Sequence, residues 1–74
     1  MSVDASVSPV TRIGETAGVV WRYLDTAGKV PIRKMLADLD QPRDLLMQAI
    51  GWLAREDKIE LTVVKRQNTI ALKR

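Results

Sequence analysis

Apolar side chains recur along this chain with two different periods, the first helical and the second that of a strand. Between Ile13 and Leu24 they are spaced by four, three, one and three residues, which places them on one face of a helix expected over residues 12–26. Thr11 is expected to cap this helix, because a threonine hydroxyl can accept a backbone N–H of the first turn. Gly28 is expected to end it, since glycine readily takes the left-handed backbone required there.

Two further helices are expected over residues 32–39 and 42–56. Pro31 and Pro42 can open them, because the first position of a helix needs no backbone N–H. The connection of three or four residues between them is the spacing of a helix-turn-helix. In the longer helix, the apolar residues lie within an arc of about 140° at roughly 100° per residue, which marks the side facing the core.

After this helix the apolar period changes to two, which indicates strands. A hairpin is expected with strands over residues 59–64 and 69–73, and the turn between them at Lys65–Asn68. Lys29–Val30 can form a minimal third strand, because a residue before proline avoids the helical conformation. Asp57 is expected to take the left-handed turn between the helix and the hairpin.

These patterns predict a mainly α domain with a small β-hairpin over residues 11–74, preceded by a flexible arm over residues 1–10. The arm is inferred from its serines and its lack of any period. The predicted core consists of apolar residues from all the elements: Ile13, Val20, Leu24, Ile32, Leu36, Leu45, Ala49, Ile50, Leu53, Ile59, Leu61 and Leu72.

Two segments, Ile13–Gly18 followed by Trp21, and Ala49–Ile59, resemble a family of small prokaryotic winged helix-turn-helix domains with no assigned function. The resemblance runs from Ile13 to Ile59. It implies three helices and a two- or three-stranded antiparallel wing. It carries over no catalytic or base-reading residue, because the family has no established activity. Asp57 stands where that family is expected to have glycine.

The residue inventory argues against an enzyme. The chain has no cysteine and no histidine, so it lacks the usual thiol nucleophile and the usual general base near neutral pH. Asp38, Asp40 and Asp44 crowd one turn, but they lack the glycine and the final glutamate of a calcium loop and are read as turn and capping residues. No cofactor, metal or small-molecule substrate is expected. No segment has the length of a membrane span or the form of a signal peptide, so a cytoplasmic protein is expected.

The net charge of +3 is unevenly distributed. Residues 1–54 contain six basic and six acidic residues, whereas residues 55–74 contain six basic and three acidic ones. The whole excess therefore lies in the hairpin and the segment leading to it, where a nucleic-acid backbone could be met. The outward face of the longer helix is neutral, which favours backbone contacts over base reading. The candidates for DNA contact are Arg33, Lys34, Arg43, Gln48, Arg55, Lys65 and Arg66.

Some apolar residues lie off the centres of the core faces, on the first and third expected helices. Such residues suit either the margin of the core or an interface with another chain. A homodimer is expected, with candidate interface residues Val19, Tyr23, Met47 and Trp52. Two functions stay open at this point. One is a DNA-binding, regulator-like protein that uses its basic wing, and the other is a winged-helix interaction or dimerisation module that binds little or no DNA.

Overall fold

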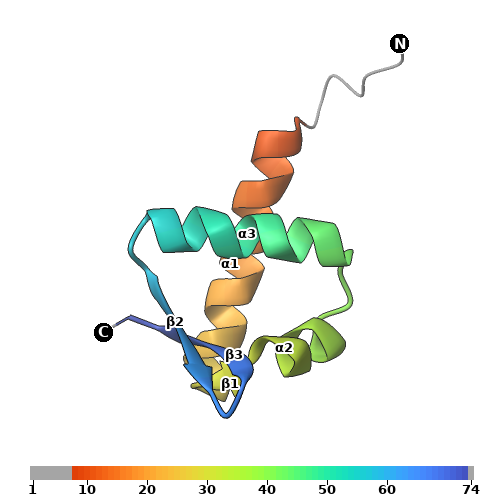
Figure 1. The fold of residues 1–74 in the computed structure, drawn as a ribbon. Helices are drawn as coiled ribbons and strands as arrows, with labels where there is room; N and C mark the ends of the chain where they lie inside the picture. Colours follow the sequence, from red (N-terminus) through yellow and green to blue (C-terminus); the bar gives the residue numbers. More distant parts are fainter. Residues whose placement is uncertain (1–7, 74) are drawn as a thin grey trace.

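The computed structural model describes residues 8–73, which form three helices and a three-stranded antiparallel sheet (Figure 1). In Figure 1 α3 crosses α1, and the sheet lies near the C-terminal end of α1. This arrangement is the winged helix-turn-helix that the sequence predicts. The elements are α1 (Pro9–Ala27), β1 (Val30–Pro31), α2 (Ile32–Asp38), α3 (Arg43–Arg55), β2 (Ile59–Val64) and β3 (Gln67–Leu72).

Helix α1 begins three residues earlier than expected, because Ser8 rather than Thr11 caps it. The Ser8 hydroxyl accepts a hydrogen bond from the Thr11 backbone N–H at 3.1 Å. Pro9 follows in the first turn, where its missing N–H costs nothing. Residues 8–10, expected in the arm, therefore belong to the helix and its cap, and the rest of the expected arm, residues 1–7, lies outside the described part of the chain.

The two helices of the helix-turn-helix are joined by residues 39–42. Pro31 and Pro42 each occupy the N-cap, one position before the place expected for them, and so interrupt no helical hydrogen bond. The Leu46 N–H donates to the Pro42 carbonyl at 3.0 Å, which closes the first turn of α3. The proline ring restricts φ at each N-cap, and so limits the directions in which the chain can enter α2 and α3.

The junction between α3 and β2 is a complete Schellman motif. The Lys58 N–H donates to the Leu53 carbonyl at 3.0 Å, and the Asp57 N–H donates to the Ala54 carbonyl at 3.1 Å. Asp57 has a φ of 61°, so it takes the left-handed turn expected of it. Its carboxylate accepts a hydrogen bond from the Lys73 ammonium at 2.6 Å, which ties the end of the sheet to this turn.

In the sheet, β3 lies between β1 and β2. Strands β2 and β3 pair without a bulge from Ile59 opposite Leu72 to Val64 opposite Gln67. The turn is therefore only two residues long, and β3 begins at Gln67 and ends at Leu72 instead of spanning 69–73. Both turn residues have positive φ, the property of a type I′ turn, whose twist matches that of the paired strands.

The core differs from the prediction at the wing and within the helices. Leu61, expected inside, is 48% exposed, because β2 is an edge strand and Leu61 lies outside its buried partner Ile70. Met35, Leu46 and Ile70 are fully buried; each lies on an apolar face indicated by the sequence but is absent from the predicted core. Five predicted core residues are only partly buried at the margin: Ile13, Ile32, Leu36, Leu45 and Leu72. The remaining six are buried as expected: Val20, Leu24, Ala49, Ile50, Leu53 and Ile59.

Candidate nucleic-acid interface

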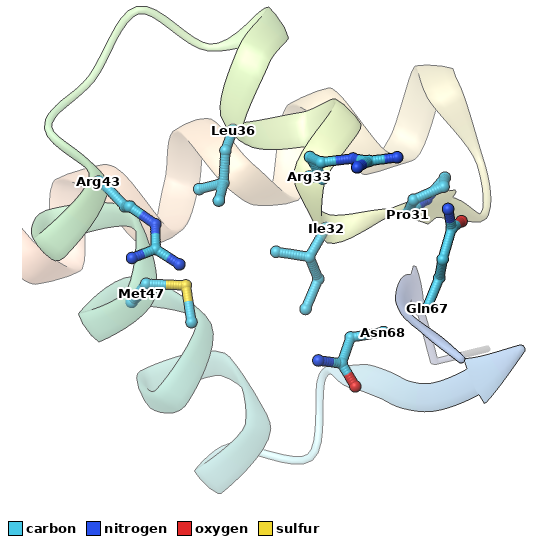
Figure 2. Close-up of a pocket in the computed structure, with 8 residues that line it drawn as sticks. All are labelled: Pro31, Ile32, Arg33, Leu36, Arg43, Met47, Gln67 and Asn68. Carbon is cyan, nitrogen blue, oxygen red and sulfur yellow. The ribbon is translucent and has the colours of Figure 1, made fainter.

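A groove of about 370 Å³ lies between the start of α2, the start of α3 and the wing. Figure 2 shows its apolar floor, where Ile32 and Leu36 of α2 face Met47 of α3. Polar side chains surround this floor on several sides. The eight residues that line the groove are Pro31, Ile32, Arg33, Leu36, Arg43, Met47, Gln67 and Asn68.

Two of the predicted DNA contacts, Arg33 and Arg43, are brought together in this groove. None of the eight lining residues is acidic, so the groove has a positive character. Arg43 is the first residue of α3, where the helix dipole disfavours a cation. Asp44 follows it in the same turn and offsets part of that cost. Figure 2 shows the two arginine side chains on opposite sides of the groove, Arg43 beside Met47 and Arg33 over Pro31, so positive charge from two different helices borders it.

The other basic pair, Lys65 and Arg66, occupies the turn at the tip of the wing, next to the lining residue Gln67. Their φ values are 51° and 68°. A left-handed backbone costs a residue other than glycine about 1–2 kcal/mol. Asn and Gly, which take this conformation easily, are absent from the turn. The wing tip therefore carries two cationic residues in a backbone conformation that is unfavourable for any residue with a Cβ atom.

Lys34 is engaged elsewhere, in a small network that joins α2 to α1. Its ammonium donates to the Asp38 carboxylate at 2.8 Å, and the same oxygen accepts a hydrogen bond from the Tyr23 hydroxyl at 2.5 Å. The bonds from Lys34 and then Tyr23 lower the pKa of Asp38. Burial, and then the bond to Asp38, raises the pKa of Tyr23 to about 12. The Lys34 pair is exposed, so it is weak enough to open for another anion.

Gln48 and Arg55, the other predicted contacts, are exposed on α3 but do not line the groove. Arg55 lies in the last turn of the helix, beside Trp52 and Glu56. Gln67 and Asn68 were missed, because they were assigned to the turn. Asn68 shares a face of the wing with the buried Ile70, and Figure 2 shows its amide directed toward Ile32. Amide side chains of this kind can contact phosphates or base edges.

The four residues expected at a dimer interface do not form one patch. Met47 lies in the groove, and Tyr23 is partly buried and bonded to Asp38. Val19 lines a hollow beside residues 41 and 45. Trp52 lies near Gly14, which is five residues before Val19 in α1 and so about 140° away around the helix. The sequence predicts a homodimer with at least two of these residues at its interface, and their placement on separate surfaces leaves that prediction untested.

Two further features are absent from residues 8–73. This part of the chain has no group of three or more acidic side chains close enough together to hold a metal ion. None of its helices is both long and apolar enough to cross a membrane.

Comparisons with known proteins agree with this architecture. The profile of a family described as winged helix-turn-helix domain (DUF2582) matches residues 9–73. An uncharacterized protein of Methanocaldococcus jannaschii, MJ1608, is 39% identical over 64 residues, which are 84% of this chain and 91% of that protein. The family match over residues 9–73 includes the helix-turn-helix, the groove and the wing. On these grounds the chain belongs to the winged helix-turn-helix domain family DUF2582.

Proposed function

We propose that this domain binds double-stranded DNA, mainly through the phosphate backbone, as a small regulator-like protein of the cytoplasm without catalytic activity. The start of α3 would face the duplex, and the wing tip would contact the backbone beside it. Arg33 and Arg43 would meet phosphates from the groove, and Lys65 and Arg66 from the tip. Sequence preference would be low, because phosphate contacts carry no base information.

The observation that carries this proposal is that three cationic residues occupy positions of unfavourable local energy. Lys65 and Arg66 have a left-handed conformation, and Arg43 stands at the positive end of a helix. Departures from local preference concentrate at functional sites, where another interaction repays their cost. All three residues lie in the groove or next to it in sequence. A polyanion is the partner that would gain from all of them together.

The test is the salt dependence of binding to a labelled DNA duplex, followed by fluorescence anisotropy. Affinity should fall steeply between about 50 and 200 mM salt. Lys65→Gln with Arg66→Gln should lower the magnitude of the log–log slope by roughly 1.8, about 0.9 for each lost phosphate contact. Affinities for different duplex sequences should fall together, because the wing would touch the backbone.

A matched control removes the same number of positive charges from the exposed surface of α1. Arg12→Gln with Arg22→Gln should leave the slope unchanged, since neither residue lines the groove. Equal effects of the two double variants would reduce the proposed interface to a general charge effect. An unchanged slope for the wing variant would remove the wing from the interface.

The alternative is an interaction module that binds another protein, with DNA contact weak or absent. Exposed apolar side chains favour it, above all Trp21, Trp52 and Val63, which are 40%, 39% and 70% exposed. Patches of such residues commonly mark binding surfaces. The same titration separates the two functions. No binding to DNA at about 50 mM salt would leave the interaction module as the better account.

A further inference from the structure

The two edges of the sheet are built very differently. Strand β1 is two residues long and ends in Pro31, which cannot donate a backbone hydrogen bond. Short strands and prolines are the usual means of preventing edge-to-edge pairing. Strand β2, at the other edge, has six residues, no proline and no bulge in its pairing with β3. It is therefore an open pairing edge of the sheet.

Side chains on β2 add apolar surface to this edge. Leu61, Val63 and Val64 are 48%, 70% and 43% exposed. Leu61 and Val63 share one face of the sheet, two residues apart. Glu60 is the single charged residue within the strand. An exposed, regular and apolar edge strand favours pairing with another strand.

The register indicates which backbone groups face outward. Pro31 pairs with Thr69 and has no N–H, so this is the pair without hydrogen bonds between β1 and β3. The backbone groups of Thr69 are therefore directed to Thr62 on the opposite strand. Bonded and non-bonded pairs alternate in an antiparallel ladder. The N–H and C=O groups of Leu61 and Val63 are thus left directed to the open edge.

We propose that a second copy of this chain pairs with β2, antiparallel, through a two-fold axis at Thr62. Each Leu61 then lies opposite the partner's Val63, and the outward backbone groups of these two residues bond to each other. The two short sheets become one six-stranded sheet. Dimer formation through β2 does not require DNA, although it shares Arg66 with the proposed DNA contact at the wing tip.

Charge complementarity selects a second copy in the antiparallel direction. Glu60 stands near one end of the strand, and Lys65 and Arg66 follow the other end. Antiparallel pairing places Glu60 opposite the partner's Val64 and diagonal to the partner's Arg66, within reach of a long side chain. Parallel pairing would instead place Glu60 beside the partner's Glu60 and the two basic tips together. Like charges at such positions oppose pairing.

The test is sedimentation of the full chain without DNA. The interface is small, so we expect a weak dimer with a dissociation constant on the order of 100 μM. Val63→Lys should raise this constant at least about tenfold, because it places a charge in the apolar cluster. Val10→Lys is the matched control: Val10 is 60% exposed on α1, and its substitution should leave the constant unchanged.

Two further readouts identify the edge itself. Glu60→Lys should weaken the dimer, and adding Arg66→Glu should restore it, as a charge swap across the two-fold axis requires. The backbone amides of Leu61 and Val63 should exchange their hydrogens more slowly as protein concentration rises. A monomer at about 1 mM, or a dimer broken by Val10→Lys and not by Val63→Lys, would overturn the proposal. Binding of a DNA duplex, measured after the oligomeric state is known, tests the proposed function separately.

Discussion

Replacing the wing-tip pair by the residues that its turn prefers should stabilise the domain. Lys65 and Arg66 have φ values of 51° and 68°, and each such conformation costs a residue other than glycine about 1–2 kcal/mol. Asparagine tolerates the left-handed region, and glycine takes it without steric cost. The double variant Lys65→Asn with Arg66→Gly therefore gives the turn a favoured type I′ sequence.

The size of the effect follows from opposing contributions. Relief of left-handed strain at the two positions stabilises the variant. The greater conformational freedom of glycine in the unfolded chain destabilises it by about 0.5–1 kcal/mol. Both native side chains are exposed, so little packing is lost. Asparagine relieves only part of the strain at position 65, so the free energy of unfolding should rise by at least about 1 kcal/mol. In a domain of this size, that corresponds to an increase in melting temperature of about 4–8 °C.

The assay is thermal and urea unfolding followed by circular dichroism. The control Lys65→Gln with Arg66→Gln removes the same charges but keeps the left-handed strain, so its stability should stay within about 0.5 kcal/mol of the unmodified protein. Both variants should lose DNA affinity to the same extent, which separates charge from stability. A turn variant no more stable than the glutamine control would refute the strain assigned to this turn.

Two other predictions concern burial and pH. Leu53→Ala should lower the free energy of unfolding by about 2–5 kcal/mol, because Leu53 is 5% exposed. Leu61→Ala should lower it by less than about 0.5 kcal/mol, because Leu61 is 48% exposed. Similar losses for the two variants would contradict this difference in burial. Tyr23 is the single tyrosine, so the absorbance of tyrosinate should report a pKa of about 12, and Asp38→Asn should lower it part of the way to 10. Because folding raises this pKa, the contribution of the protonated phenol to stability is complete below pH 10 and lost as the pH rises to 12. The lowered pKa of Asp38 has the opposite sign: its contribution is present above the ordinary value of 3.8 and lost on further acidification.

Much of the fold could be predicted from the sequence, because the apolar period changes where the elements change. Gly28 and Asp57 have the positive φ values expected of them at two element ends, although the ψ of −147° at Gly28 lies outside the left-handed helical region. The start of α1 was misplaced because Ser8 and Thr11 are both capping residues, and only the structure shows which one accepts the hydrogen bond. Leu61 was misplaced because alternation assigns a face of the sheet but not the distance of a strand from the helices.

The candidate site was only partly predictable. The charge of Arg33 and Arg43 makes both candidates from sequence, but their placement on the same groove depends on how α2 and α3 pack, which no local pattern encodes. Gln67 and Asn68 were missed because Lys-Arg is not a typical type I′ pair, so a longer turn was expected. The outward position of Met47 on α3 was predicted, but its place in the groove depends on the wing, which is distant in sequence.

The most direct test of the central claim, that the groove and the wing tip face DNA, is a nuclear magnetic resonance titration of the isotope-labelled protein with a duplex at low salt. The account predicts that the largest shift changes occur at the backbone amides of Arg43, Gln67 and Asn68 and of the Lys65–Arg66 turn. The amides of the first turn of α1, from Val10 to Arg12, should stay unchanged. Changes centred on α1, with the groove and the tip unaffected, would contradict it.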